Sequence, residues 1–556
     1  MDHIRKAEAW ICDKLKNKQK KPFVSDLETV QEYKERWRSI YIIYFTMFLI
    51  SLGFSIILTG VWPYLDKLDP HAGKEFMGYI VAANPFAQML FSPLVGWWSN
   101  KLGSIRLPVL VSLALFTVAS AMYSSLELLP SHRKYWMLGT RFLVGVSSAN
   151  IAACRSYLSA ATTVDERTKA VSMISLFQVL GFIIGPALQA VVVPLGSEGV
   201  WLVYNHLRLN MYTASGWINV FLSILNFCCF FPAIFKERRI AVKEAMQQQG
   251  VKTEKETWKG TKPDYISAWT LIVAFFVIVF NFMLLETLGT SLTMDQFAWT
   301  KAEALYYMGI LMSVGAVIAC VCFGAINPLS KRFPEVNVMI WGGFLFMVLG
   351  RGVYIPWGDG PPLIYNETER LTIYHDKSIC KSFYTNSTGG YDFNSTINLN
   401  STDLNCNNVT ELVGCPSSQT WCYHTRKMTL FQFILGYALT AIGYPIGVTL
   451  IQTIFSKILG PRPQGVWMGL MTGSGCFSRV LGPVFVTYIY TKLGTNWTFG
   501  MTTIMMILIM VWLLIFNKRL EPKTPVKVEQ QSEGGKEMQE IKILINPPSS
   551  DVPVKV

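Results

Sequence analysis

SIYIIYFTMFLISLGFSIILTGVWP, residues 39–63, contains no charged side chain. Because a helix rises about 1.5 Å per residue, about 20 apolar residues cross a hydrocarbon core of about 30 Å. Eleven further stretches share this apolar character and length. The twelve predicted spans cover residues 39–63, 76–98, 107–128, 135–158, 168–194, 213–235, 266–288, 303–326, 336–356, 429–456, 464–490 and 497–517. We therefore expect an all-α membrane protein with twelve transmembrane helices.

The composition supports this class. Hydrophobic residues make up 51% of the chain and charged residues 15%, whereas soluble domains carry about 25% charged residues. A net charge of +13 can indicate a nucleic-acid partner. Here the basic residues concentrate in the N-terminal tail and in alternate connecting segments, which is typical of the cytoplasmic side of membrane proteins. We expect cytoplasmic N and C termini, the lipid bilayer as a partner, and no nucleic acid.

The segment between the ninth and tenth spans, residues 357–428, is predicted to be a lumenal or extracellular loop. Its four cysteines are an even number in one non-cytoplasmic loop, which favours disulfides with three possible connectivities. Its five Asn-x-Ser/Thr sequons favour glycosylation, and a sixth sequon precedes the last span. The cysteines are Cys380, Cys406, Cys415 and Cys422, and the sequon asparagines are Asn366, Asn386, Asn394, Asn400, Asn408 and Asn496.

Six predicted spans lie on each side of a polar linker. The expected parts are a basic N-terminal tail (1–38), an N-terminal six-helix bundle (39–235), a cytoplasmic linker (236–265), a C-terminal six-helix bundle with the loop 357–428 (266–517) and a cytoplasmic tail (518–556). We expect the linker, rich in Lys and Gln, to be too polar to bury. The layout resembles the major facilitator superfamily, whose pseudo-symmetric halves hold a substrate near the membrane midplane.

The turn after the second span reads Gly96-Trp-Trp-Ser-Asn100-Lys101-Leu-Gly103-Ser-Ile-Arg106. It resembles the superfamily signature Gly-x-x-x-Asp-Arg-x-Gly-Arg-Lys/Arg. Gly96 would allow two helices to approach closely, Gly103 would permit a tight turn, and the cations would meet helix ends across the bundle interface. We expect a conformational latch at this turn, with an ordinary positive-inside turn as the alternative. Because Asn100 replaces the acid of the signature and Lys101 its arginine, a charge relay through that acid is in doubt.

Spans five and eleven occupy equivalent positions in the two halves, and both contain a Gly-Pro break. The glycines predict close helix crossings and the prolines predict kinks. A break in both halves indicates a binding region at the interface between the repeats, and a purely structural kink is the alternative. The break residues are Gly181, Gly185 and Pro186 in span five and Gly475, Gly482 and Pro483 in span eleven, and Gln178 and Gln189 flank the first break as candidates for the transport pathway.

Few ionisable residues lie within the predicted spans. Arg479 is the deepest and is the strongest candidate for an anion-facing group, while Glu286 is the best candidate for proton coupling. Arg141 begins an Arg-x-x-x-Gly pattern that resembles a family motif tied to proton-coupled transport, and it should face the bundle interior or reach the interface. Arg155, at the other end of that span, could reach the headgroups. Arg351 could pair with Glu286, and a structural ion pair is the alternative reading for each.

The C-terminal tail contains Glu540-Ile-Lys-Ile-Leu544-Ile545, which fits an acidic dileucine sorting signal. Residues 33–39, 62–65, 293–300 and 456–465 resemble a lysosomal branch of the major facilitator superfamily. This resemblance implies a lysosomal or late endosomal membrane protein with chloride-channel activity. The branch carries its dileucine in the N-terminal tail, whereas this chain offers Glu540, Leu544 and Ile545 in the other tail. The plasma membrane is therefore the alternative location, and sorting adaptors are expected partners.

Three functions follow from these features. The first is transport of a small anion, with chloride-channel activity implied by the resemblance. The second is proton-coupled, alternating-access transport of a small organic solute, and the third is a non-transporting receptor or scaffold. We expect neither an enzyme nor a cofactor or metal, since the sequence lacks a Gly-x-Ser-x-Gly motif, a zinc-ligand spacing and a phosphate-binding loop.

Overall fold

The computed structural model describes residues 27–365 and 413–521, apart from residues 59, 70–72, 130, 197–198, 204–206, 252 and 261–262. Helices form where the sequence predicts spans. In chain order they are α2 (Val30–Leu58), α4 (Gly73–Leu102), α5 (Arg106–Ser124), α6 (Arg133–Ser148) continued by α7 (Asn150–Ala160), α8 (Val164–Val192), α9 (Thr213–Cys229), α12 (Tyr265–Phe297), α13 (Lys301–Arg332), the run α14 (Glu335–Asn337), η3 (Val338–Phe344) and α15 (Leu345–Val353), α17 (Leu430–Leu459) and α18 (Gly465–Ile515).

The label α18 covers the last two predicted spans. Gly494 lies between them with a φ of 84°, a conformation that glycine adopts without strain. A Cβ atom built on Gly494 would lie 2.6 Å from the ring of Trp421, so the ring packs directly against this turn. One glycine therefore separates the eleventh span from the twelfth.

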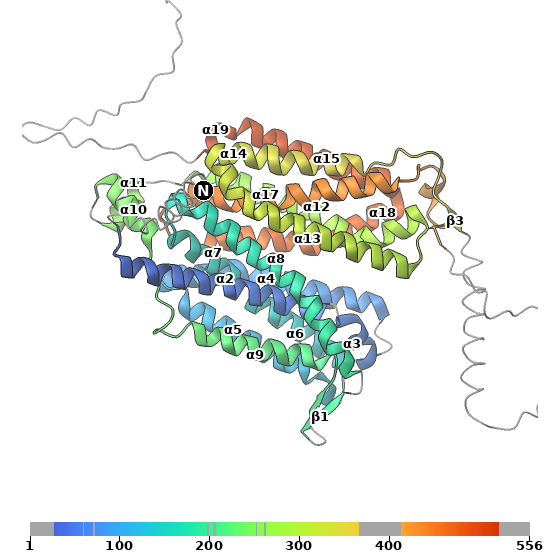
Figure 1. The fold of residues 1–556 in the computed structure, drawn as a ribbon, viewed down its shortest axis with the longest axis horizontal. Coiled ribbons are helices and arrows are strands. Elements are labelled where there is room, and N and C mark those ends of the chain that lie inside the picture. Colours follow the sequence, from blue (N-terminus) through green and yellow to red (C-terminus); the bar gives the residue numbers. More distant parts are fainter. Residues whose placement is uncertain are drawn as a thin grey trace, which may run out of the picture.

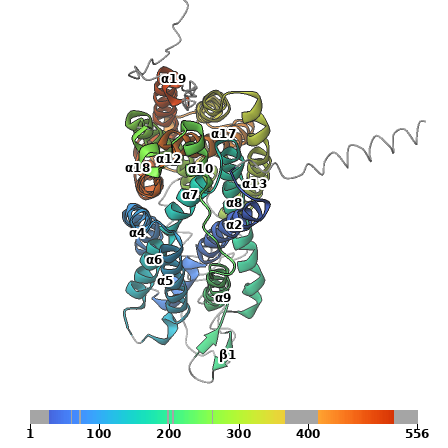
Figure 2. The ribbon, with the colours of Figure 1, turned by 90° about the vertical axis from the view of Figure 1, so that its left-hand side faces the viewer.

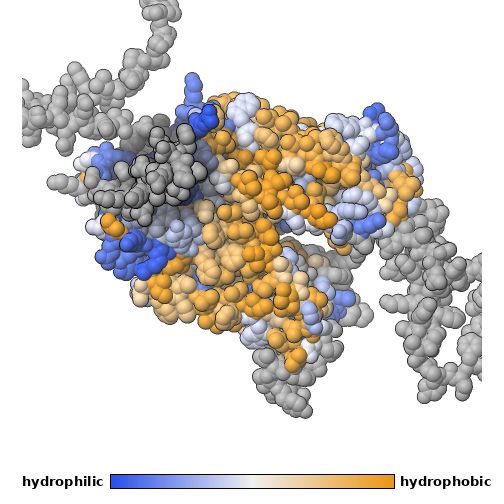
Figure 3. Space-filling view, in the orientation of Figure 1, coloured by the Kyte–Doolittle hydropathy of each residue, from blue (hydrophilic) through white to orange (hydrophobic). Residues whose placement is uncertain are grey.

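Within the described ranges, nine helices are long and apolar enough to cross a membrane. The second half of α18, the proline-containing α4 and the shorter α9 complete the twelve spans. Figure 3 shows hydrophobic side chains over the middle of the molecule and hydrophilic ones gathered toward its two ends. Val317 and Val321 of α13 and Val484 of α18 are more than 60% exposed in the protein alone, as expected for side chains that face lipid.

The spans form two groups with equivalent internal packing (Figure 1). In the N-terminal half α2 packs against α8, and in the C-terminal half α12 packs against α18. Between the halves, α4 contacts α18 and α8 contacts α13. Figure 2 looks along the helices and shows the two groups, with α7 and α8 between them. The twelve-helix major facilitator fold expected from the sequence is confirmed.

The two ends of the bundle differ. One end, here called the loop end, carries the short helix α3 (Val61–Leu68), the 3-10 turns η1 (Leu126–Leu128) and η2 (Val193–Leu195), an antiparallel pair β1 (Val200–Val203) and β2 (Leu207–Leu209), a parallel pair β3 (Ile364–Tyr365) and β4 (Cys415–Pro416), and the 3-10 turn η4 (Thr420–Tyr423). The opposite end, here called the linker end, carries α10 (Ile240–Gln249), α11 (Glu254–Gly260) and α19 (Asn517–Leu520).

The expectation that the linker is too polar to bury is wrong. Ile240, Ala241 and Val242 at the start of α10 are buried. Glu244 accepts a hydrogen bond of 3.1 Å from the backbone N–H of Val164, and burial raises the pKa of its carboxyl. A short apolar segment inside the polar linker thus fixes α10 against the N-terminal half. The linker also contacts the other half, because Arg462 donates a hydrogen bond to the carbonyl of Trp258 in α11.

A capping carboxylate anchors the start of the C-terminal half. Asp264 precedes α12 and accepts hydrogen bonds from the backbone N–H groups of Ile266 and Ser267, which satisfies donors that a helix start leaves free. The guanidinium of Arg519 in α19 bonds to the same carboxylate and holds the pKa of Asp264 at about 2. The first and last helices of this half are thereby joined at the linker end.

Candidate functional site

Two arginines from opposite halves lie at the centre of the bundle. Arg155 on α7 donates a hydrogen bond of 3.2 Å to Oε1 of Gln178 on α8. Arg479 on α18 lies close enough to Arg155 for the two cations to repel each other. In the described part of the chain, the Arg479 guanidinium makes no hydrogen bond or ion pair. Two positive charges therefore meet between the halves, and neither forms an ion pair in the described residues.

Glu286 on α12 is the acidic group of this centre. Its side chain is exposed although it lies among the helices, and its carboxylate interacts electrostatically with Arg479 and with Tyr437 of α17. One turn before it, Phe282 stacks on Tyr444 of α17 with ring centroids 3.9 Å apart. The centre thus brings two arginines and one acid together beside the stacked rings of Phe282 and Tyr444.

Arg141 lies apart from this centre, inside the N-terminal half. Its side chain is 1% exposed and its three guanidinium nitrogens have no hydrogen-bond partner in the described structure. The guanidinium stands over the ring of Phe54 at 5.4 Å, which is a cation–π contact. It therefore faces the bundle interior, and it does not snorkel.

The expected pairing of Arg351 with Glu286 does not occur in the described structure. Arg351 is fully buried and donates a hydrogen bond to the carbonyl of Asn281, and its guanidinium lies 5.9 Å from the ring centre of Tyr354. Glu286 instead faces Arg479. Because α12 brings Asn281 toward α15 and turns Glu286 toward α18, the two side chains point to different neighbours.

The turn motif forms a contact between the halves at the linker end. The Asn100 side-chain carbonyl accepts a hydrogen bond of 2.9 Å from the backbone N–H of Gly465, the first residue of α18. A Cβ atom on Gly96 would lie 2.1 Å from the carbonyl oxygen of Gly465. Only glycine fits at Gly96, so this position allows α4 to touch α18 backbone to backbone. Asn100 thus acts as a neutral hydrogen-bonding group where the signature has an acid.

The three other residues of that motif, Lys101, Gly103 and Arg106, make their polar contacts outside the C-terminal half in the described structure. Gly103 has a φ of 64° and turns the chain. Arg106 donates a hydrogen bond of 2.8 Å to the carbonyl of Phe230 in the same half, and the ammonium of Lys101 lies 5.2 Å from the ring centre of Trp97. Neither cation contacts the other half in the described residues. The inter-half contact of the motif therefore rests on Gly96 and Asn100.

A second contact between the halves involves Arg167 and Lys457, two residues that no sequence motif indicates. Arg167 is buried and donates a hydrogen bond of 3.2 Å to the carbonyl of Ser456 at the end of α17. The Lys457 ammonium lies 2.9 Å from the Glu335 carboxylate and 3.2 Å from the Thr168 hydroxyl. The capping box of α8 at Thr163 fixes the turn that carries Arg167. The sequence predicts this capping box, but it does not predict which residue of the other half Arg167 contacts.

The glycines of the Gly-Pro breaks pack inside each half. A Cβ atom on Gly181 would lie 2.4 Å from the carbonyl of Phe48 on α2, and one on Gly475 would lie 2.6 Å from the ring of Phe275 on α12. The expected close crossings therefore exist. The breaks do not form the surface between the repeats, since Gly185 likewise faces α2 and Gly482 faces α12. Pro186 and Pro483 lie inside helices α8 and α18, which continue past them.

The two glutamines have different surroundings. Gln178 joins the central site through Arg155, whereas Gln189 donates a hydrogen bond of 2.9 Å to the carbonyl of Met211 within the N-terminal half. Glycines on α18 that the sequence did not single out form the inter-half seam. Gly465 and Gly469 lie one turn apart, and Cβ atoms on them would lie 2.3 Å and 2.5 Å from backbone oxygens of α4.

Part of the predicted loop chemistry can be located. Cys415 and Cys422 lie side by side at the loop end with Cα atoms 6.4 Å apart, and Asn496 is exposed near the Gly494 turn. The residues Cys380, Cys406, Asn366, Asn386, Asn394, Asn400, Asn408, Glu540, Leu544 and Ile545 lie outside the described residues. Among described side chains, no group of three or more His, Cys, Asp and Glu is arranged to hold a metal ion.

Comparisons with known proteins place this geometry in a family. The family model of the Major Facilitator Superfamily matches residues 43–366 and 412–550. "Major facilitator superfamily domain-containing protein 8" of Xenopus laevis is 38% identical over 501 residues, which cover 89% of this chain and 94% of that protein. "Multidrug resistance protein 2" of Bacillus subtilis (strain 168) is 26% identical over 318 residues, covering 56% and 72%.

Solved structures share the fold. The human organic anion transporter MFSD10 (TETRAN) has a TM-score of 0.56 at 15% identity, covering 86% of this chain and 99% of that one. A variant of the E. coli fucose:proton symporter FucP has a TM-score of 0.55 at 11% identity, covering 87% and 99%. The length of the family match, the relative with 38% identity and the paired six-helix halves agree, and the chain belongs to the Major Facilitator Superfamily of membrane transport proteins.

Proposed function

We propose that the protein carries a small anion across an endolysosomal membrane by alternating access. The observation that carries this proposal is the meeting of Arg479 and Arg155 from opposite halves, with the Glu286 carboxylate as the acidic group near Arg479. Two cations held at the boundary between two moving bodies repel each other, and an anion between them removes that repulsion. A bound anion would therefore stabilise the conformation in which both halves reach it.

The distribution of inter-half contacts favours a carrier over a channel. Among described residues, the hydrogen bonds between the halves all lie at the linker end, where Asn100, Arg167 and Thr168 are bonded to the C-terminal half. Figure 3 shows a notch between the halves toward the loop end. A protein closed at one end and open at the other gives access from one side at a time. Chloride conduction, which the family resemblance suggested, would need both ends open together.

Glu286 gives this carrier a means of proton coupling. Its carboxylate competes with an incoming anion for Arg479. Protonation of Glu286 would free that guanidinium for the anion, and release of the proton would return the carboxylate to it. We propose that proton and anion move in the same direction for this reason.

The orientation and location complete the proposal. The linker end faces the cytoplasm, and the loop end faces the lumen, where Cys415 and Cys422 form a disulfide and Asn496 is glycosylated. A Cα separation of 6.4 Å lies within the range for disulfides, and an exposed asparagine is accessible to modification. The signal at Glu540–Ile545 would direct the protein to endolysosomal membranes.

The test is transport by purified protein in liposomes, with chloride and a panel of small carboxylates and phosphates supplied under gradients at pH 5 and pH 7. We expect saturable uptake of an anion that is lost in Arg479→Ala and in Arg155→Ala, and kept in Arg332→Ala, which removes an exposed cation at the linker end. Glu286→Gln should keep anion exchange and lose acceleration by a pH gradient.

Three outcomes separate the functions. Slow saturable uptake supports the carrier, whereas a current that reverses at the chloride potential and falls in Arg479→Ala establishes the channel instead. A folded protein that neither takes up anions nor conducts overturns both. A scaffold would lose its function when residues 366–422 are deleted and would be indifferent to Arg479→Ala.

A further inference from the structure

A basic groove lies on the outer surface of the N-terminal half at the linker end. It has a volume of about 640 Å³ and runs between the first turns of α2 and α8. Lys34 and Arg38 of α2 and Lys169 of α8 line it, and all three side chains are exposed. Within the described structure none of these cations has a carboxylate partner. Arg38 reaches only the carbonyl of Ala233, at 3.5 Å.

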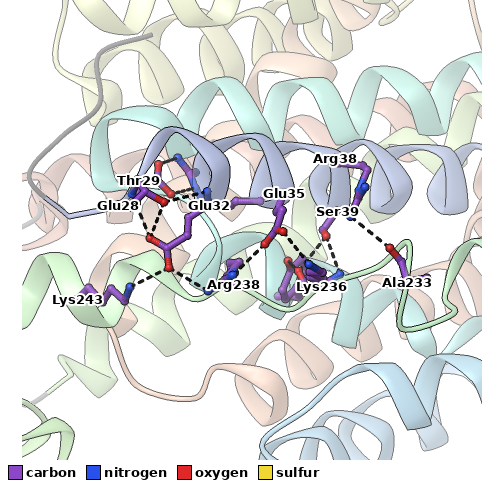
Figure 4. A network of polar contacts seen from close by, with 12 residues as sticks. Glu28, Thr29, Glu32, Glu35, Arg38, Ser39, Ala233, Lys236, Arg238 and Lys243 are labelled. Carbon is purple, nitrogen blue, oxygen red and sulfur yellow. Dashed lines mark hydrogen bonds and ion pairs between the residues drawn. The ribbon is translucent and has the colours of Figure 1, made fainter.

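The charges of α2 are sorted by face. Its acidic residues point toward the linker segment, where Glu32 and Glu35 bind Arg238 at 2.9 Å each and Glu35 binds Lys236 at 2.7 Å (Figure 4). The preference of cytoplasmic segments for basic residues does not explain why acids and cations lie on different faces of α2, because cations paired with neighbouring acids would satisfy it equally well. Here every acid on this part of α2 is neutralised on one face, and unpaired cations remain on the other.

An aromatic row forms the floor of the groove. Trp37 contacts Tyr33 and Tyr41 with ring centroids 6.2 Å and 5.9 Å apart, and the Lys169 ammonium lies 5.9 Å from the ring centre of Trp37. The indole Nε1–H of Trp37 is buried and has no acceptor in the described structure. The groove therefore combines three exposed cations that lack a carboxylate partner with an aromatic floor.

We propose that this groove binds the headgroup of an anionic phospholipid in the leaflet at the linker end. The groove lies where the apolar run 39–63 begins, and Tyr41 is 59% exposed there, which is the depth at which aromatic side chains meet headgroups. Phosphate oxygens would accept from the three cations, while the acyl chains would lie along the apolar surface of α2. A soluble anion would gain the charges and lose the acyl contact.

The position of the groove couples it to the closed linker end. Lys169 follows Arg167 and Thr168, the α8 residues that bond to the C-terminal half. A lipid held by Lys169 and by α2 would fix the first turn of α8 in the geometry that makes those bonds. Occupied grooves would therefore favour the state that is closed at the linker end.

The experiment is native mass spectrometry of the full-length protein released from detergent after incubation with phosphatidylinositol phosphate or with phosphatidylcholine of the same chains. The test variant carries Lys34→Gln, Arg38→Gln and Lys169→Gln. The matched control carries Lys331→Gln, Arg332→Gln and Lys518→Gln, which remove the same charge from exposed positions at the linker end of the other half. At about a fivefold effect per surface cation, the test variant should bind the anionic lipid about 100-fold more weakly, while the control keeps wild-type affinity.

The single variant Lys169→Gln provides a second measurement, because it removes the α8 cation of the groove and leaves the α2 face unchanged. It should weaken anionic lipid binding severalfold and leave the melting temperature near that of the wild type. Equal losses in test and control variants would reduce the effect to general surface charge and overturn the site, as would unchanged binding in the test variant. Displacement of the lipid by soluble inositol phosphate at equal concentration would show that the site recognises a free phosphate and would also contradict the proposal.

Discussion

Gly96→Ala should open the linker end. A Cβ atom at this position would lie 2.1 Å from the carbonyl oxygen of Gly465 and 3.1 Å from the backbone nitrogen of Val466. Both atoms belong to the backbone of a helix, so neither can rotate away. Restoring ordinary contact requires α4 and α18 to separate by about 1 Å, which also stretches the bond between Asn100 and Gly465.

The added methyl group of Gly96→Ala should destabilise only the conformation that is closed at the linker end. Overpacking of this kind costs about 1–3 kcal/mol. Since α4 and α18 touch here only when the linker end is closed, that cost is removed when it opens. The ratio of open to closed protein should therefore rise about 5–150-fold.

Hydrogen exchange measured by mass spectrometry tests this without introduced labels. The Gly465 amide, which bonds to Asn100 across the halves, should exchange faster in Gly96→Ala by the same factor, measured in peptides that cover residues 456–465. Gly309→Ala is the matched control, since a Cβ at that helical glycine meets nothing within 4 Å. Identical exchange in the two variants would refute the reasoning that the α4–α18 contact closes this end.

Three further predictions concern stability. Gly494→Ala combines a φ of 84° with a contact of 2.6 Å to an aromatic ring, so it should lower the free energy of unfolding by about 1–3 kcal/mol. Its melting temperature should be lower than that of the control Gly500→Ala, where the added methyl group meets open space. Burial raises the pKa of the Glu244 carboxyl, so docking of α10 should be strongest at low pH and weaken as the pH rises through that pKa. Glu244→Gln should abolish this pH dependence, measured by hydrogen exchange corrected for intrinsic rates. A pH profile that is the same in the variant and the wild type would contradict the prediction. Arg519 lowers the pKa of Asp264 from 3.8 to about 2, so this carboxylate adds stability above pH 3.8 that is lost as the pH falls through about 2. Asp264→Asn should remove that part of the acid-induced fall in melting temperature. A fall of the same size in both proteins would exclude a stabilising role for the Asp264–Arg519 pair.

Much of the fold was readable because each span has to satisfy its own backbone in lipid. The apolar runs predict the helices, and the gap between the last two spans contains Gly494, where the structure turns. The linker was misjudged because its average composition hides the apolar triplet at residues 240–242. Burial of these three residues depends on which face of α10 they occupy and on the packing of that face near Val164. The average composition of the linker contains neither piece of information.

The site was only partly readable. Arg479 and Glu286 stand out because charges are rare inside spans, and they do lie at the centre. The sequence does not decide whether Arg155 reaches the headgroups or the interior, since a long cation near a helix end can reach either. The pairing of Arg351 was wrong, because which face of α12 carries Asn281 and which carries Glu286 depends on how the helix is rotated in the bundle.

The sequence alone determined the class of protein, the number of spans, the division into two halves and the short list of charges inside the membrane, because hydrophobic burial and backbone satisfaction act along a single helix. Tertiary structure decided which of those charges meet. Arg155 and Arg479 are more than 300 residues apart and come together only when α7 and α18 cross between the halves. It also decided that Asn100, Arg167 and Lys457 close the linker end, since a contact between two halves depends on their relative position, which no local pattern encodes.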